Sequence, residues 1–286
     1  MIEILLAIFF ITVLLLFLSS GIWVAISMIG VSSIGMILFT SRPVGDAMAT
    51  TIWGASSSWT LTALPLFVWM GEILFRTKLS ENLFEGLAPW LQKLPGGLIH
   101  VNVVGCALFA AISGSSAATV ATVGKMSIPE LRKRKYPEKI LLGSLAGSGT
   151  LGLLIPPSII LIIYGVTVQE SIAKLFIAGI IPGIMIALIF MGYVIIWSLL
   201  NKNKMPLTEE NYSFLNKLSK SKQLIPVILL ILGVIGSIYT GIATATEAAS
   251  LGVVGALILS YFQKSLNLET FKESLLGATK TSCMIA

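Results

Sequence analysis

Two short runs of small and hydroxyl-bearing residues stand out in a chain that is otherwise strongly apolar. The first, Ser-Gly-Ser-Ser-Ala-Ala-Thr, spans residues 113–119, and the second, Gly-Ser-Gly-Thr, spans residues 147–150. Hydroxyl groups, and backbone carbonyls freed from helical hydrogen bonding, are hard oxygen ligands of the kind that hard cations prefer. We therefore predict a sodium site that needs no carboxylate, formed by Ser113, Gly114, Ser115, Ser116, Gly147, Ser148, Gly149 and Thr150.

Other features that could do chemistry have simpler interpretations. Isolated small residues in membrane helices commonly serve close helix packing rather than a site. Glu72 lies one turn before Arg76 and Glu247 lies at a predicted helix start, so both carboxylates have structural roles that compete with proton transfer. The chain has no phosphate-binding Gly-x-x-x-x-Gly-Lys-Ser/Thr loop and no His-Glu-x-x-His motif, so we predict no enzymatic activity and no cofactor.

The composition places these runs in a membrane protein. Hydrophobic residues make up 56% of the chain and charged residues 11%, and the mean hydropathy is +0.94. Soluble proteins carry about 25% charged residues, and a membrane-spanning helix needs roughly 20 mostly apolar residues. We predict an all-α polytopic membrane protein with spans near residues 3–19, 22–40, 61–76, 140–168, 173–200, 223–240 and 246–263.

The segment 97–133 carries the first hydroxyl run and is too short in each half to cross. Its first apolar arm, Leu98 to Ile112, would be about 22 Å long at 1.5 Å per residue, short of the ~30 Å hydrocarbon core. A second arm from Val120 to Leu131 returns to a basic cluster. Polar, non-helical backbone at membrane depth must be buried in protein or line a water-filled cavity. We predict a re-entrant helical hairpin with its tip at residues 113–119.

The second hydroxyl run belongs to an interrupted helix. Within the predicted span 140–168, the run at residues 147–150 is followed by Pro156 and Pro157, and each proline costs about 3 kcal/mol in a helix interior. We therefore predict a broken helix beside the hairpin tip. Broken helices at membrane depth are typical of transporter binding sites, where helix C-termini hold cations and helix N-termini face anions.

The basic residues favour a membrane topology over nucleic-acid binding. Cytoplasmic loops of membrane proteins are enriched in Lys and Arg. The chain has 19 basic residues, and all of them except Arg42 and Lys174 fall in clusters over residues 76–93, 125–139, 202–222 and 264–280. If these clusters face the cytoplasm, the N-terminus lies outside.

The chain is predicted to contain four segments. The first two segments are residues 1–60 and residues 61–200, and the second of these holds the hairpin and the broken helix. Residues 201–222 would form a cytoplasmic linker. Residues 223–286 are the last segment, and because residues 278–286 look like the first turns of another helix, we expect the sequence to be truncated there.

Four motifs resemble the large membrane subunit of the tripartite ATP-independent periplasmic (TRAP) transporters. Their order and spacing agree along nearly the whole chain, and the two middle motifs are the specific ones. The last departs from the family pattern at Ala245, where the family usually has proline. The motifs are Leu64-Pro65-Leu66-Phe67 followed by Gly71-Glu72; Ser113 to Thr119 with Gly124; Gly152 to Ser158; and Gly241 to Ala249.

The resemblance implies an inverted-repeat, elevator-type transporter in a bacterial inner (cytoplasmic) membrane. It implies that residues 1–60 supply scaffold helices and a connecting arm, that residues 61–200 form half of a transport domain, and that residues 223–286 begin a second repeat with scaffold helices. It implies sodium-coupled import of a carboxylated solute such as a dicarboxylate, a sialic acid or a sugar acid. A small four-helix membrane subunit and a periplasmic substrate-binding protein would be its partners, besides the lipid bilayer. We expect Ser115, Thr119, Pro157 and Ser158 to contact the substrate carboxylate. Alternatives are a sodium- or proton-coupled anion transporter of the same superfamily without a binding protein, an ion channel subunit, or a structural membrane subunit.

Overall fold

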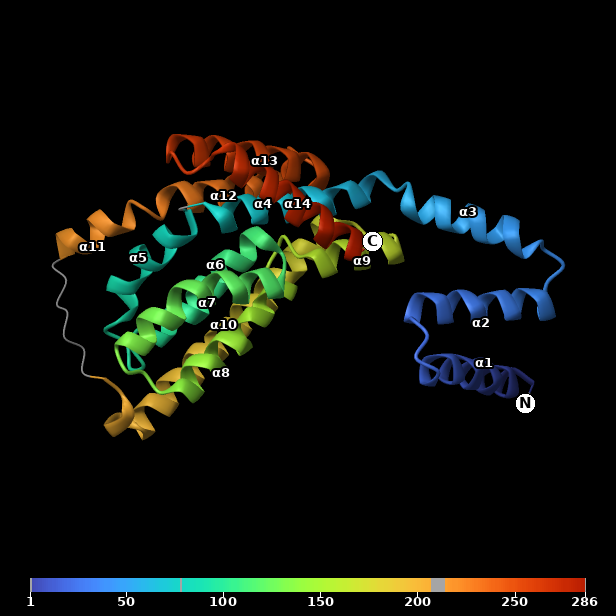
Figure 1. Cartoon of the computed structure of the whole chain (residues 1–286), viewed down its shortest axis with the longest axis horizontal. Coiled ribbons are helices and arrows are strands. Elements are labelled where there is room, and N and C mark those ends of the chain that lie inside the picture. Colours follow the sequence, from blue (N-terminus) through green and yellow to red (C-terminus); the bar gives the residue numbers. More distant parts are fainter. Residues whose placement is uncertain (1, 78, 207–213, 286) are drawn as a thin grey trace. The chain divides into compact units, whose positions relative to one another are not determined.

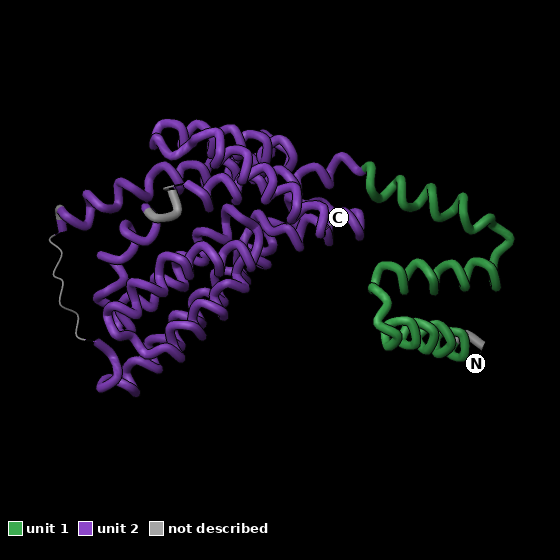
Figure 2. The backbone as a smooth tube through the Cα atoms, in the orientation of Figure 1, with its two compact units in different colours: residues 1–57 green, residues 58–286 purple. Residues whose placement is uncertain are grey.

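The chain folds into helices throughout the part that the structure describes. The computed structural model describes residues 2–77, 79–206 and 214–285, and every regular element in these ranges is a helix. The chain divides into two compact units, Met1–Ser57 and Ser58–Ala286 (Figure 2). The all-α class predicted from the sequence is confirmed.

The first unit contains three helices, α1 (Ile2–Ser19), α2 (Val24–Phe39) and α3 (Val44–Ser56). A turn at Gly21, whose φ is +75°, joins α1 to α2. Gly30 and Gly35 of α2 lie directly against the rings of Phe17 and Phe10 of α1, so glycine permits the close approach of these two helices. Helix α3 was not predicted as a separate element, because its Thr-, Gly- and Ser-rich sequence lacks a long apolar run.

The second unit is a bundle that packs around α4 and the α6–α7 pair (Figure 1). It begins with a short 3-10 turn at Trp59–Thr62. Its first helices are α4 (Ala63–Arg76), α5 (Leu79–Leu91), α6 (Ile99–Ser113), α7 (Ser116–Lys133) and α8 (Glu138–Gly149). A 3-10 turn (Thr150–Leu153) follows, and then α9 (Ile159–Val168), α10 (Ile172–Leu200), a 3-10 turn (Lys202–Lys204), α11 (Phe214–Ser221), α12 (Ile225–Tyr239), α13 (Ala245–Phe262) and α14 (Leu268–Ile285).

The predicted segment 97–133 contains a helical hairpin, α6–α7, and the predicted segment 140–168 contains an interruption between α8 and α9, but the boundaries of both differ from the prediction. Residues 116–119 form the first turn of α7 rather than part of an open tip, because Ser115 caps that helix. Residues 147–149 are the last turn of α8, and the non-helical stretch lies later, between the 3-10 turn and α9. The prolines, which lack the N–H that a helix requires, therefore set the position of the break more directly than the glycines do.

Two further boundaries correct the sequence prediction. The last helix, α14, has 18 residues and begins at Leu268, more than half of its length before the expected start near residue 278. Asn267 explains this start, because its side-chain oxygen accepts a hydrogen bond from the amide of Thr270 at 2.6 Å, as an N-terminal cap does. The predicted linker 201–222 contains the short helix α11, while residues 207–213 lie outside the described residues.

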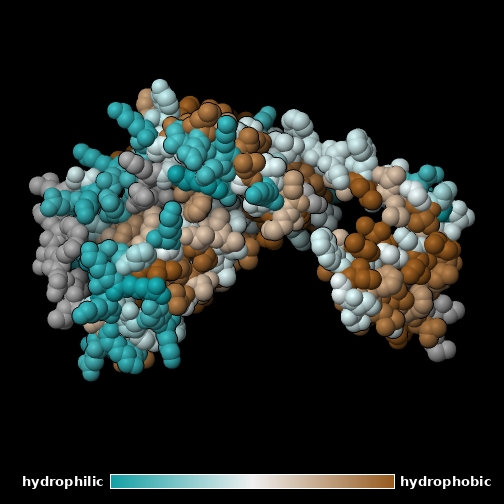
Figure 3. All heavy atoms as spheres, in the orientation of Figure 1, coloured by the Kyte–Doolittle hydropathy of each residue, from teal (hydrophilic) through white to brown (hydrophobic). Residues whose placement is uncertain are grey.

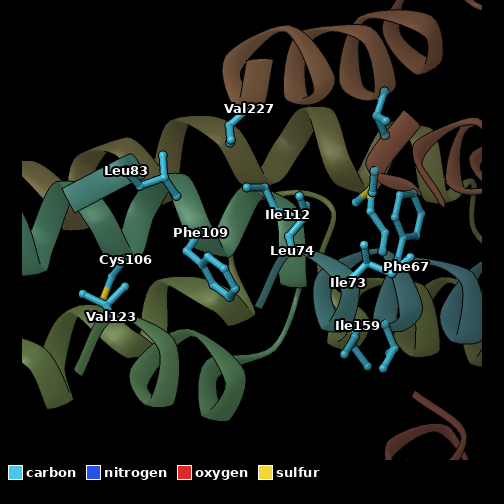
Figure 4. Packing of buried hydrophobic residues seen from close by; sticks show 14 of the residues in the cluster. Phe67, Ile73, Leu74, Leu83, Cys106, Phe109, Ile112, Val123, Ile159 and Val227 are labelled. Atoms are coloured by element: carbon cyan, nitrogen blue, oxygen red, sulfur yellow. The ribbon is translucent and has the colours of Figure 1, made fainter. Parts of the chain in front are cut away.

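The core of the second unit forms where α4 packs against α6, α9, α10 and α13. Phe67 and Phe109 are fully buried, and the ring of Phe67 meets that of Phe176 edge to face at 6.2 Å between centroids. In Figure 4, Ile112 of α6 lies beside Leu74 of α4, and a Cβ atom at Gly71 of α4 would lie 2.8 Å from the Cα of Ser113, so the hairpin contacts α4 near its tip. This contact fixes the place of the tip within the bundle.

The helix lengths agree with a membrane protein that has both spanning and shorter apolar helices. Helices α10, with 29 residues, and α13, with 18, are long and apolar enough to cross a bilayer, whereas α1, α2, α6, α9 and α12 are shorter apolar helices. Figure 3 shows hydrophilic side chains gathered at the end of the second unit where α7 ends and α8 begins. That end carries the basic cluster 125–139.

The packing of α13 against α4 and α12 gives a test of the fold. A Cβ atom built at Gly252 would lie 2.5 Å from the sulfur of buried Met70 and 3.1 Å from a methyl of Val234. We expect Gly252→Leu to lower the free energy of unfolding by about 1–3 kcal/mol through overpacking. The measurement is thermal unfolding in detergent, with Gly236→Leu as the matched control because a Cβ there would have no neighbour within 4 Å. Equal unfolding temperatures for both variants would contradict this packing.

Candidate functional site

Two residues, Gly114 and Ser115, form the turn between the helices of the hairpin. Helix α6 ends at Gly114, whose left-handed φ of +59° favours glycine and whose amide donates to Ala110 O at 3.0 Å. The next residue, Ser115, is extended, and its hydroxyl accepts a hydrogen bond from the amide of Ala118 at 3.4 Å, which caps the start of α7. The C-terminal end of one helix and the N-terminal end of another therefore lie side by side at the tip.

A buried pair of hydroxyl groups links the two helices of the hairpin at its tip. The hydroxyl oxygens of Ser113 and Thr119 lie 3.0 Å apart, and both residues are buried. The Ser113 hydroxyl also lies 3.3 Å from Ser115 O, to which it can donate. These contacts join the last turn of α6 to the first turn of α7, so Ser113 and Thr119 hold the tip in shape.

The broken helix ends and restarts around a five-residue stretch without helical structure, residues 154–158. After α8, the chain continues as a 3-10 turn to Leu153 and then runs without helical structure until α9 begins at Ile159. Ser158 organises the restart, since its buried hydroxyl donates to Leu153 O at 2.7 Å and accepts from the amide of Leu161 at 3.4 Å. One serine thus satisfies a carbonyl of the first segment and an amide of the second.

The tip and the break touch through their backbones. The amide of Ile159 donates to Gly114 O at 3.2 Å. A Cβ atom at Gly114 would lie 2.5 Å from Pro157 O, and a Cβ atom at Gly152 would lie 2.9 Å from the carbonyl carbon of Ser115. Two glycines therefore allow main chain to meet main chain where four helix ends converge (Figure 1).

The structure brings some of the predicted site residues together and places others elsewhere. Gly114 of the tip meets Pro157 O and the Ile159 amide next to Ser158, and Ser115 meets Gly152. Ser113 and Thr119 contact each other inside the tip, and Ser116 O faces Gly149. Gly147 instead faces the ring of Phe190 on α10. The Ser148 hydroxyl donates to Ser144 O within α8 and lies 3.4 Å from Asn102 O on α6, so it points into the bundle away from the tip.

A shallow groove of about 410 Å³ opens beside this junction, between α7 and α8. The exposed Thr150 lies at its edge, with its hydroxyl donating to Gly147 O at 2.7 Å. Small side chains make up most of its surface, which is lined by Ser116, Ala117, Val120, Ala121, Ala146, Gly149 and Thr150. Ser116 and Thr150 are the hydroxyl groups of the site that remain accessible from this groove.

The charge at the junction comes from helix ends alone. The sequence has no acidic or basic side chain in residues 113–119 or 147–158. The N-terminal ends of α7 and α9 carry partial positive charge, and the C-terminal ends of α6 and α8 carry partial negative charge. Such a junction can hold a cation on carbonyl and hydroxyl oxygens and a carboxylate on amides, because neither needs a charged side chain as partner.

The two acidic residues considered from the sequence have structural partners. Glu72 pairs with Arg76 at 3.1 Å, and Arg76 also pairs with Glu273 of α14 at 2.6 Å. Glu247 accepts hydrogen bonds from the amide and the hydroxyl of Thr244 at 2.7 and 2.8 Å, which completes a capping box at the start of α13. The structural interpretation of both carboxylates is therefore confirmed.

Sequence reasoning missed two residues that shape the site. A Cβ atom at Gly71 of α4 would lie 2.8 Å from the Cα of Ser113, so glycine lets α4 press against the tip. Asn102 donates to Ser144 Oγ at 3.0 Å and joins the stem of the hairpin to α8. Gly71 occurs in a conspicuous Gly-Glu pair, but its distant partner cannot be read from local sequence.

Comparison with known proteins identifies the family of this chain. The family model described as the tripartite ATP-independent periplasmic transporter, DctM component, matches residues 11–286. The chain belongs to the DctM family of TRAP transporter large membrane subunits. The family resemblance inferred from the four motifs is thereby confirmed, and the relatives are transporter permeases rather than enzymes.

Several relatives of this DctM-family chain have names that state a substrate. The C4-dicarboxylate TRAP transporter large permease protein DctM of Pseudomonas aeruginosa is 33% identical over 90% of this chain and 60% of its own length. The sialic acid TRAP transporter large permease protein SiaM of Vibrio cholerae is 33% identical over 93% of this chain and 62% of its own. The isethionate TRAP transporter permease protein DctMQ of Oleidesulfovibrio alaskensis is 34% identical over 94% and 42%, respectively. The chain thus spans about three-fifths or less of the length of these relatives.

The contact between tip and break predicts a strong effect at Gly114. We expect Gly114→Ala to destabilise the protein, because the left-handed conformation costs a non-glycine residue about 1–2 kcal/mol. The new methyl group would in addition collide with Pro157 O. Unfolding in detergent measures the effect, with Gly143→Ala on α8 as the control because a Cβ there has no neighbour within 4 Å. An unfolding temperature for Gly114→Ala as high as that of the control would refute the contact.

Proposed function

We propose that this chain is part of the large permease subunit of a sodium-coupled, ATP-independent secondary transporter that imports a small organic acid. The main support is the junction of a hairpin tip and a broken helix, which gathers four helix ends in the interior of an apolar bundle. Such ends supply oxygen ligands for a cation and amides for an anion without buried charged side chains. Membership of the DctM family supports the same assignment.

Within the proposed site, sodium binds on the groove side of the junction. The accessible hydroxyls of Ser116 and Thr150 and the carbonyls at the ends of α6 and α8 are its ligands. The buried Ser113 and Thr119 hold the tip in place. The predicted set also included Gly147 and Ser148, which face away from the tip and contribute by shaping the last turn of α8.

The substrate carboxylate is proposed to lie at the N-terminal ends of α7 and α9. Ser115 and Ser158 cap these two helices, and Pro157 and Thr119 lie next to them. The relatives are named for C4-dicarboxylates, sialic acid and isethionate, which supports a small organic acid as the solute. A sugar acid fits the same chemistry.

Delivery and movement follow the pattern proposed for the family. A periplasmic binding protein delivers the solute, a small four-helix membrane subunit assists the permease in the bacterial inner membrane, and the hairpin moves with a transport domain in an elevator mechanism. The segments 1–60, 61–200, 201–222 and 223–286 keep their predicted roles, with a second, inverted repeat beginning in the last segment. That repeat would supply the other half of the site.

Use of the membrane potential to drive uptake requires more than one sodium ion for each monoanion. One sodium ion with one monoanion moves no net charge, so the membrane potential, about 2.3 kcal/mol per charge per 100 mV, would be unused. A hundredfold accumulation needs about 2.7 kcal/mol. We expect solute uptake into proteoliposomes that hold the permease containing this chain, the small subunit and the binding protein to depend on sodium with a Hill coefficient above one.

The uptake experiment has two outcomes that contradict the proposal. A first-order dependence on sodium would exclude the second ion. Uptake or ion conductance that persists without the binding protein would indicate a transporter of another type or a channel. Liposomes with potassium in place of sodium are the control, and they should accumulate no solute.

Thr150 gives a residue-level test of the ion site. We expect Thr150→Val to raise the half-saturating sodium concentration about tenfold, because a hydrogen bond or ligand contact to a charged group contributes roughly 1.5–3 kcal/mol. Thr167→Val on α9 is the matched control, since its exposed hydroxyl donates to Ile163 O at 2.8 Å much as Thr150 donates to Gly147 O. A sodium dependence that is the same in both variants would remove Thr150 from the site.

A further inference from the structure

A second, larger groove lies between α8 and α10, on a part of the second unit that the proposed transport site does not use. Its volume is about 560 Å³, within the 300–1,000 Å³ range of small-molecule sites. Helix α8 supplies Lys139, Ile140, Gly143 and Ser144, and helix α10 supplies Ile189, Phe190, Tyr193, Val194 and Trp197. A Cβ atom at Gly143 would have no neighbour within 4 Å, so open space lies beside α8 at that level.

The floor of the groove is well packed. Ile140 and Val194 are buried against Ile99, and Tyr136 and Trp197 cover this small cluster. Tyr136 also accepts a hydrogen bond from the amide of Leu98 at 3.1 Å. Packed side chains from three helices, α6, α8 and α10, therefore support the floor of the groove.

The two ends of the groove differ in polarity. At one end stand the exposed Lys139, in the first turn of α8, and Trp197, near the end of α10. The other end narrows where Gly147 meets the ring of Phe190. From Lys139 to Gly147 the depth is about 12 Å at 1.5 Å per residue, close to one leaflet of a ~30 Å hydrocarbon core.

The charge around the polar end is positive. Lys202 and Lys204 follow α10 and are exposed. The neighbouring carboxylate, Glu138, is already paired with Arg132 through bonds of 2.8 and 3.2 Å. In the part of the chain that the structure describes, no carboxylate forms an ion pair with Lys139.

We propose that this groove binds an anionic phospholipid of the cytoplasmic leaflet, with an acyl chain along Gly143 and Phe190 and the phosphate at Lys139. Basic pockets between membrane helices on the cytoplasmic side recognise anionic headgroups, and Trp and Tyr favour the headgroup level. The orientation rests on the cytoplasmic placement of the basic clusters and not on the transport site. Helix α8 is the first half of the broken helix, so the bound lipid would connect that half to the cytoplasmic leaflet.

The test measures lipid retained by the purified chain, by native mass spectrometry after incubation with phosphatidylglycerol or phosphatidylcholine. We expect one phosphatidylglycerol to bind with preference over phosphatidylcholine. Gly143→Leu, which fills the groove, should reduce bound phosphatidylglycerol at least tenfold. Gly233→Leu on α12 is the matched control, because Gly233 is exposed and a Cβ there also has no neighbour within 4 Å, and it should retain the lipid.

The headgroup contact is tested separately. Lys139→Gln should weaken phosphatidylglycerol binding about fivefold, the effect expected for one interfacial lysine, and leave phosphatidylcholine binding unchanged. Equal lipid retention by Gly143→Leu and Gly233→Leu, with both variants folded by circular dichroism, would overturn the proposal. So would the absence of a preference for the anionic lipid. None of these outcomes depends on transport activity.

Discussion

The hydrogen bond from the amide of Ile159 to the carbonyl of Gly114 joins two places where helices stop inside an apolar bundle. Backbone groups freed at a helix end have no water to bind at membrane depth, so protein must satisfy them. The chain does this by placing the end of α6 and the start of α9 in direct contact and by capping α7 and α9 with Ser115 and Ser158. A site for ions or acids can exist at such a junction because its polar groups are already ordered.

Close approach of main chain requires the absence of side chains at a few positions. Gly71 lets α4 touch the tip, and Gly114 and Gly152 let the tip touch the break. Because α4 also forms the centre of the apolar core through Phe67 and Leu74, the position of the junction is coupled to the packing of the whole second unit. A change in these glycines would therefore disturb both the fold and the site.

The charged side chains of the chain serve other purposes. Arg76 links α4 to α14 through Glu72 and Glu273, and Glu247 caps α13, so these carboxylates stabilise helices rather than the junction. The junction itself carries no charged side chain. A coupling ion and an anionic solute would consequently compensate each other there, which is a physical reason for the two to move together.

The sequence by itself determined the all-helical class, most of the apolar helices, the hairpin and the break, because apolar length and proline chemistry act locally. It also indicated the family, through motifs whose order is visible in one dimension. Only the tertiary structure decided that residues 116–119 form the first turn of α7 and that Ser148 points toward Asn102 rather than the tip. Those outcomes depend on which helix faces which, a property of packing between residues far apart in the chain. The same reason explains why the groove at Gly143 was not predicted, since its walls belong to helices about 50 residues apart.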